Sequence, residues 1–168
     1  MGDLFGMLMR YMLVAILFAT PVLGVAAQKA DFVLVRKSES KLYLKAGDKT
    51  LRVYRVALGT RPKGKKQWVG DERTPEGRYV LDYKKSNSSF YKAIHISYPN
   101  ESDRKRAAEL GVSPGGAIMI HGQPNGLGRL AAVNQMFNWT DGCIAVTNHE
   151  MDQIWDAVEP GTPIEIVP

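Results

Sequence analysis

The sequence predicts a mainly β domain with two or so short helices, folded as a β-sandwich or a similar β-rich architecture. Short runs rich in β-branched and aromatic residues recur along the chain, and segments containing Gly, Pro, Ser or Asn separate them. Helix signals, in contrast, occur at two places after residue 28. Many short strands joined by turn signals favour a sandwich over an alternation of strands and helices.

Eight runs have the composition of strands. The first two are separated by Lys37-Ser38-Glu39-Ser40, which is a hairpin signal. In the third run, apolar residues alternate with arginines, as in a half-buried strand. In chain order the predicted strands are Phe32–Arg36, Lys41–Lys45, Leu51–Leu58, Arg78–Tyr83, Ala93–Ser97, Ala117–His121, Cys143–Thr147 and Ile164–Val167.

Two helices are expected between these strands. The first covers Asp103–Leu110, with Ser102 as its N-cap and Gly111 as its end. The second begins after Thr147, which has capping-box spacing to Glu150. Its apolar residues lie at helical spacing and predict a face packed on the core; they are Met151, Ile154, Trp155 and Val158.

Two long segments lack periodicity, Gly59–Gly77 and Gly122–Gly142. Loops of this length inside a compact domain are usually functional or mobile. The apolar stretch Leu130–Trp139 in the second segment could fold over a cleft as a lid. A short helix over Leu130–Met136 that simply covers the sheet is the alternative, and the sequence does not separate the two.

Residues 1–27 have the organisation of an export signal. Arg10 is the only positive side chain, Tyr11–Phe18 is apolar, and the small residues Val25 and Ala27 stand three places and one place before a candidate cleavage point. The favoured prediction is a cleaved signal peptide. An uncleaved N-terminal membrane anchor is the alternative, because the apolar stretch approaches the length of a spanning helix.

The remainder, residues 28–168, is expected to be one exported domain. Its size suffices for a hydrophobic core without disulfide bonds. The formal net charge of the chain is +5. Export makes nucleic acid an improbable partner, whereas an anionic lipid surface or an anionic wall polymer fits this charge. A membrane partner is expected only if the N-terminal segment is retained.

Cys143 is the only cysteine, so it cannot form a disulfide within the chain. It follows Gly142 at the predicted start of a strand, and His121 ends another strand just before Gly122. A nucleophilic cysteine needs a base within hydrogen-bond reach and a group that orients that base. The pattern therefore favours a catalytic thiol, and the alternative is a buried cysteine that acts as a small hydrophobic residue.

The histidines do not predict a metal site. His95, His121 and His149 are far apart in the sequence and lack the close spacing of zinc ligands. His149 lies in the first turn of a helix, where a surface position is expected. His95 points opposite to its isoleucine neighbours, which fits either a satisfied, half-buried side chain or a role in the cleft. We expect no metal and no other cofactor.

The pattern His121-Gly122, followed by Thr140-x-Gly142-Cys143-Ile144, resembles the YkuD-type L,D-transpeptidase domain. Upstream, Thr74-Pro75-Glu76-Gly77 is similar to a Thr-Pro-x-Gly segment of that family. The likeness extends from about Phe32 to Val167. The string Trp139–Asn148 is most similar to the YafK-like branch of the family.

The resemblance implies a sandwich-like catalytic domain in the bacterial periplasm or cell envelope that acts on peptidoglycan stem peptides. Cys143 would attack the carbonyl of the third residue of a tetrapeptide stem and release D-alanine. His121 would be the base, oriented by the backbone carbonyl of Gly122, and the amides of Cys143 and Gly142 would stabilise the oxyanion. An amine from a second stem or from a wall-anchored lipoprotein would then resolve the thioester.

Two residues depart from the family pattern. Asp141 stands where most members have histidine, and a carboxylate there disfavours a thiolate unless it points away or is paired. Ala145 stands where many members have a substrate-holding arginine or asparagine. We expect substrate contacts from other residues instead; the candidates are His95, Thr140, Arg129 and Asn148.

The residues leave two alternatives to transpeptidation open. If water resolves the thioester, the same site makes a cysteine amidase or hydrolase that cuts stem-peptide or lipoprotein linkages. If Asp141 and Ala145 mark lost activity, the domain is an inactive wall-binding module.

Overall fold

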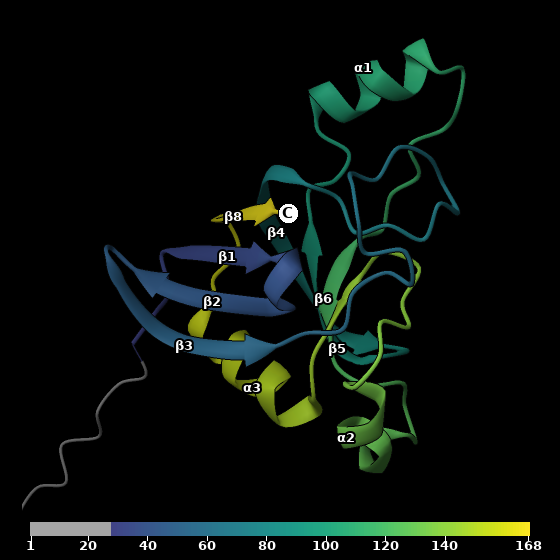
Figure 1. Ribbon diagram of the computed structural model, residues 1–168. Coiled ribbons are helices and arrows are strands. Elements are labelled where there is room, and N and C mark those ends of the chain that lie inside the picture. Colours follow the sequence, from purple (N-terminus) through teal and green to yellow (C-terminus); the bar gives the residue numbers. More distant parts are fainter. Residues whose placement is uncertain (1–27) are drawn as a thin grey trace, which may run out of the picture.

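The computed structural model describes residues 28–168 (Figure 1). The predicted signal peptide lies outside the described residues. Within residues 28–168, no helix is long and apolar enough to span a membrane.

Eight strands form one mixed sheet in the order β3-β2-β1-β8-β4-β5-β6-β7. Most neighbours are antiparallel, but β1 pairs with β8, and β6 with β7, in parallel. The strands are β1 (Phe32–Arg36), β2 (Lys41–Ala46), β3 (Lys49–Arg55), β4 (Gly77–Ser88), β5 (Tyr91–Ile96), β6 (Met119–His121), β7 (Ile144–Ala145) and β8 (Thr162–Val167). The mainly β prediction is thus confirmed.

The sheet curls until its two edges approach each other. After β3 the chain continues to Ala57, which exchanges both backbone hydrogen bonds with Ala145 of β7 at 2.9 and 2.8 Å. Because β3 and β7 are the edge strands, this contact closes the layer on itself and gives a sandwich-like interior. It also explains why β3 ends at Arg55 and not at Leu58 as predicted.

The interior is filled by inward-facing residues of the strands and by one helix. Val33 and Val35 of β1 and Leu42 and Leu44 of β2 alternate with more exposed residues, as expected for strands with one buried face. Helix α3 (Asn148–Ala157) packs on the same core (Figure 1). Its predicted apolar face is confirmed: Met151, Ile154 and Val158 are buried, and Trp155 is partly buried against them.

The caps of the two main helices were predicted with different success. For α3 the capping box is confirmed, because Thr147 Oγ1 accepts from the Glu150 amide and the Glu150 carboxylate accepts from the Thr147 amide. For α1 (Glu101–Glu109) the predicted N-cap Ser102 is wrong. Asn100 fills that place, since its side-chain oxygen accepts from the Asp103 amide at 3.0 Å.

The segment between β6 and β7 contains two short helical turns, η2 (Gly128–Leu130) and α2 (Ala131–Asn134). A short helix therefore forms, but it does not cover the sheet, because none of its residues is buried. Its larger apolar neighbours also remain exposed, namely Leu127, Leu130, Val133, Met136 and Phe137. In Figure 1, α1 and α2 lie at opposite ends of the molecule.

Buried and half-buried side-chain amides hold this segment in place. The Asn134 amide donates to Gln123 Oε1 at 2.8 Å, and the Gln135 amide donates to the Ala145 carbonyl at 3.0 Å. Further along, Asn138 Oδ1 accepts from the Leu58 amide at 2.9 Å. The segment is thus fixed to β7 and to the continuation of β3.

Candidate active site

Cys143 and His121 share one cavity of about 440 Å³. Residues from four parts of the chain line it: the end of β4 with the β4–β5 turn, β5, the segment leading into β6, and the segment before β7. They are Lys85, Ser88, Ser89, Phe90, Ala93, Ala117, Met119, His121, Trp139, Thr140, Asp141 and Cys143. The fold thus brings together the two residues that the sequence singled out.

The turn that carries Cys143 is held by Thr140. The Thr140 hydroxyl donates to the Cys143 carbonyl at 2.7 Å and accepts from the Gly142 amide at 3.2 Å. The Gly142 amide is therefore already engaged. No hydrogen bond within residues 28–168 uses the Cys143 amide, which leaves that N–H available to an oxyanion.

A neighbouring loop supports this turn from behind. Gly142 has φ +128°, and a Cβ there would lie 2.6 Å from the carbonyl oxygen of Arg73. A similar close approach occurs at Gly59, where a Cβ would lie 2.2 Å from the Glu72 carbonyl oxygen. The Gly59–Gly77 loop, whose length suggested a functional or mobile segment, therefore packs directly on the turn that carries Cys143.

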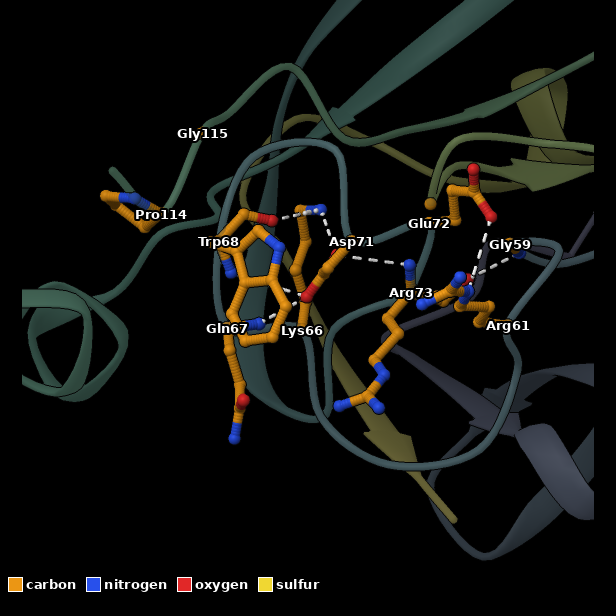
Figure 2. A network of polar contacts seen from close by, with 12 residues as sticks. Gly59, Arg61, Lys66, Gln67, Trp68, Asp71, Glu72, Arg73, Pro114 and Gly115 are labelled. Atoms are coloured by element: carbon orange, nitrogen blue, oxygen red, sulfur yellow. Dashed lines mark hydrogen bonds and ion pairs between the residues drawn. The ribbon is translucent and has the colours of Figure 1, made fainter. Parts of the chain in front are cut away.

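A buried ion pair fixes the shape of that loop. Lys66 Nζ lies 2.7 Å from Asp71 Oδ1, and their side chains are 3% and 1% exposed. Asp71 also accepts from the backbone amides of Gln67 at 2.7 Å and Arg73 at 3.2 Å. Figure 2 shows Lys66 and Asp71 turned toward each other inside the loop, with Trp68 and Arg73 on either side.

The Gly59–Gly77 loop also contacts the segment before β6, which carries the carbonyl group that lies next to the Cys143 thiol. The Val69 amide donates to the Ser113 carbonyl at 2.9 Å. Figure 2 shows Pro114 and Gly115, the next two residues of that segment. That segment continues to Ala117, whose carbonyl oxygen lies 3.7 Å from Cys143 Sγ. Ala117 has φ +55°, an uncommon conformation for a residue with a side chain.

The thiol of Cys143 is neutral in this environment. Burial raises its pKa, a hydrogen bond from the Met119 amide lowers it, the charge of Asp141 raises it, and the charge of Lys66 lowers it; the net shift is upward. Asp141 lines the cavity, and its negative charge disfavours the thiolate, as the sequence led us to expect.

His121 has the tautomer that a base for this thiol requires. Its side chain is buried, with the residue 4% exposed, and Nδ1 lies 2.7 Å from the carbonyl oxygen of Gly122. A carbonyl can only accept, so Nδ1 carries the proton and Nε2 keeps its lone pair. Burial lowers the pKa of His121 more than this hydrogen bond raises it, and the ring is therefore neutral near pH 7.

Two aromatic residues that were not among the predicted site residues enclose His121. Phe90 lies with its ring centroid 4.6 Å from that of His121, and Trp139 meets His121 edge-on at 5.8 Å. Trp139 precedes Thr140 in the motif, which was its only signal in the sequence. Phe90 lies in the β4–β5 turn, far from the motif, and nothing local marked it.

The other predicted substrate-binding residues lie in different surroundings. Thr140 lines the cavity, whereas His95, Arg129 and Asn148 do not. His95 of β5 is bound to Asp82 of β4, with His95 Nδ1 2.7 Å from Asp82 Oδ1. Arg129 is exposed on η2.

Asn148 holds the segment that follows His121. Asn148 Oδ1 accepts from the backbone amide of Gln123 at 2.8 Å. The same oxygen lies so close to Gly122 that a Cβ on residue 122 would be 2.7 Å from it. Ala145, the second departure from the family pattern, is fully buried and brings no charge to the cavity.

No group of three or more His, Cys, Asp or Glu side chains within residues 28–168 is arranged to hold a metal ion.

Comparisons with known proteins agree with the fold and the motif. The model of the YkuD family, the L,D-transpeptidase catalytic domain, matches residues 30–166. "Putative L,D-transpeptidase YafK" of Escherichia coli K12 is 31% identical over 138 residues, which cover 76% of this chain and 48% of that protein. The chain thus spans about half the length of the curated relatives that it matches.

Solved structures of similar fold include proteins of the same family. The helical cell shape determining protein Pgp2 of Campylobacter jejuni is 26% identical with a TM-score of 0.62, and the match covers 80% of this chain and 46% of that one. L,D-transpeptidase 1 of Mycobacterium tuberculosis has the same fold at 17% identity and a TM-score of 0.51, over 82% of this chain and 60% of that one. This chain therefore belongs to the YkuD family of L,D-transpeptidase catalytic domains.

Proposed function

We propose that this domain is a cysteine acyltransferase that acts on the tetrapeptide stems of peptidoglycan in the periplasm or cell envelope, after export directed by residues 1–27. The observation that carries the proposal is the shared cavity of Cys143 and His121, with the imidazole held by the Gly122 carbonyl at 2.7 Å. This is the nucleophile, base and orienting group that acyl transfer by a thiol needs.

In the proposed first step, His121 Nε2 takes the proton of the thiol as Cys143 Sγ attacks the carbonyl of the third stem residue. General-base activation suits this site because burial keeps both groups neutral before substrate arrives. The Cys143 amide stabilises the oxyanion of the tetrahedral intermediate. The C–N bond then breaks, the proton passes from His121 to the leaving nitrogen of D-alanine, and a thioester remains on Cys143.

In the second step an acceptor amine attacks the thioester carbonyl. His121 takes a proton from the amine, the C–S bond breaks, and the thiol is regenerated. An amine on a second stem gives a crosslink, and an amine on a wall-anchored lipoprotein gives an attached protein. A role in cell shape is consistent with this chemistry, since the similar Pgp2 is a cell shape determining protein.

Hydrolysis is the second candidate, and one observation favours it. The apolar stretch Leu130–Trp139 includes α2, and no residue of α2 lines the cavity. Trp139 is the only residue of this stretch that does. A site that is not covered by a lid admits water to the thioester. Water in place of the amine would make the domain an amidase for stem-peptide or lipoprotein linkages.

Mass spectrometry of purified muropeptides incubated with the full chain tests these possibilities. Dimers joined through third-position residues are the expected product of transpeptidation, whereas shortened monomers or released lipoprotein indicate hydrolysis. If wild-type protein gives neither product, and alkylation of Cys143 leaves its binding to peptidoglycan unchanged, the domain is an inactive wall-binding module.

A further inference from the structure

One row of residues crosses four strands on the cavity face of the sheet. Lys85 of β4 pairs with Ala93 of β5, Ala93 pairs with His121 of β6, and His121 pairs with Ala145 of β7. Directly paired residues on neighbouring strands project from the same face. Lys85, Ala93 and His121 indeed all line the cavity.

The row sets the spacing between the lysine Lys85 and the proposed base His121. Neighbouring strands lie about 4.8 Å apart, so the backbone positions of Lys85 and His121, two strands apart, are separated by about 10 Å. Between them stands Ala93, whose methyl group leaves the floor of the cavity open. At the far end of the row, Ala145 is buried and uncharged.

Lys85 is the positive charge of this cavity. Among its lining residues, Asp141 is the acid and His121 is neutral, which leaves the Lys85 ammonium as the single cation. Within residues 28–168, Lys85 forms no ion pair and no side-chain hydrogen bond, and it is exposed to solvent. Its charge is thus available to a ligand.

The preceding residue shows that this orientation is specific. Lys84 pairs with the buried Ile94 and faces the opposite side of the sheet. There its Nζ donates to the Trp155 carbonyl at 2.7 Å and lies 3.8 Å from Glu159. Two consecutive lysines on one strand therefore have opposite roles: Lys84 is bound to α3, and Lys85 faces the cavity.

We propose that Lys85 is the carboxylate-binding residue of the substrate cleft and determines which end of the stem peptide enters next to the β4–β5 turn. The proposal rests on the proposed function, because it names the stem peptide as ligand. A stem carboxylate is attracted to Lys85 and repelled by Asp141, so the peptide lies with a carboxylate toward β4 and its scissile carbonyl between Cys143 and His121. Ser88 and Ser89 also line the cavity, and their hydroxyl groups are further donors for a carboxylate.

Two stem carboxylates could be the one bound: the terminal carboxylate of D-alanine and the carboxylates earlier in the stem. Three synthetic tetrapeptide stems distinguish them: one with all carboxylates free, one with the C-terminal carboxylate converted to the amide, and one with the other carboxylates amidated. The stem whose amidation weakens binding to wild-type protein, but not to Lys85→Met, identifies the carboxylate.

The experiment compares Lys85→Met, Lys85→Arg and Lys84→Met in the full chain. For the free-acid stem, Lys85→Met is expected to raise KM about tenfold or more with little change in kcat, because loss of a ground-state charge contact weakens binding without altering the reacting groups. Lys85→Arg restores most of the affinity. Lys84→Met leaves KM unchanged, since Lys84 lies on the other face. Added salt reduces the difference between wild type and Lys85→Met.

Binding measured by calorimetry in a Cys143→Ala background keeps the test independent of turnover. If the free-acid and amidated stems bind equally to wild type and Lys85→Met while wild type turns over substrate, the inference is overturned and the proposed function stands. If no stem binds to Cys143→Ala, the proposed function and the inference both fail. A selective loss of free-acid binding in Lys85→Met supports Lys85 even where the products show hydrolysis.

Discussion

Gly142 lies against the carbonyl oxygen of Arg73 so closely that any side chain on residue 142 would overlap with it. A Cβ would lie 2.6 Å from the Arg73 oxygen and 3.3 Å from Ile118 Cδ1. Gly142 is therefore required by its contact with Arg73, 69 residues earlier in the chain, as well as by its own positive φ.

Gly142→Ala is expected to displace the nucleophile turn and abolish turnover. The left-handed backbone alone costs about 1–2 kcal/mol for a residue with a side chain, and the overlap with Arg73 adds to this cost. Gly47→Ala is the matched control, because Gly47 has φ +55° and nothing within 4 Å of its Cβ position. Urea unfolding should show a larger decrease in the free energy of unfolding for Gly142→Ala than for Gly47→Ala. Equal decreases would contradict the role of the Arg73 contact.

Cys143→Ala and His121→Ala are each expected to abolish detectable turnover while the chain remains folded. The first removes the nucleophile, and the second removes a base that typically contributes about 10²–10⁴-fold in rate. Turnover should be followed by mass spectrometry of muropeptides, with circular dichroism as the control for folding. Activity of His121→Ala within tenfold of wild type would exclude His121 as the base.

The pH dependence should reveal a neutral pair. His121 must be unprotonated to act, and its pKa is lowered from the ordinary 6.5, so the acid limb of kcat/KM should have its midpoint below pH 6.5. The pKa of Cys143 is raised from 9.0, so alkylation of the free enzyme should still be accelerating above pH 9. An alkylation rate that is flat from pH 5 to 9 would instead indicate a preformed thiolate–imidazolium pair.

The same shift of His121 affects stability. The unfolded chain takes up a proton at this ring near pH 6.5, whereas the folded chain does so only at lower pH. The neutral His121 ring therefore contributes its full share to the free energy of unfolding above pH 6.5, and this contribution decreases as the pH falls below that value. Comparing the free energy of unfolding of wild type and His121→Gln between pH 5 and 8 isolates this contribution, which should vanish in the variant.

Asp141→Asn is expected to make the thiol more reactive at neutral pH. Burial is the largest cause of the raised Cys143 pKa, and it is unchanged in this variant, but the carboxylate charge that also raises the pKa is removed. Alkylation by iodoacetamide at pH 7 should be faster than in wild type. Asp48→Asn, a change at an exposed acidic residue of the β2–β3 turn, should leave the rate unaltered.

Lys66→Met is expected to destabilise the domain by about 3–5 kcal/mol, because it leaves the buried Asp71 carboxylate without its partner. The double variant Lys66→Met/Asp71→Leu should recover much of this loss, since two apolar side chains of similar volume replace the ion pair. Denaturant unfolding measures both. In the double variant the Cys143 pKa should also rise, because the Lys66 charge that lowers it is absent.

Much of the fold could be predicted because its signals are local. Runs of β-branched and aromatic residues between turn signals marked each of the eight strands, and the Thr147–Glu150 capping box marked the start of α3. The boundaries that failed depended on distant partners. Leu58 was placed in a strand, but the chain leaves β2 after Arg55 to meet Ala145, and Asn100 replaced Ser102 as N-cap because its side chain reaches the Asp103 amide.

The candidate site was predictable in part for the same reason. His121, Gly122, Gly142 and Cys143 form a short, specific pattern, and the cavity contains both reactive side chains. The basic residue of the cavity was not predictable, since nothing in the sequence separates Lys85 from Arg129 as a candidate. Arg129 lies on η2 away from the cavity, and Lys85 lines it.

The sequence by itself determined the β-rich class and the helix α3, and it singled out the thiol and the histidine that share the cavity, because strand composition, capping and the motif are properties of neighbouring residues. The tertiary structure decided which lysine faces the cavity, which carbonyl confines Gly142, and that both reactive groups are neutral. These features arise from strand register, from loops packed across the chain and from burial, which depend on residues far apart in the sequence.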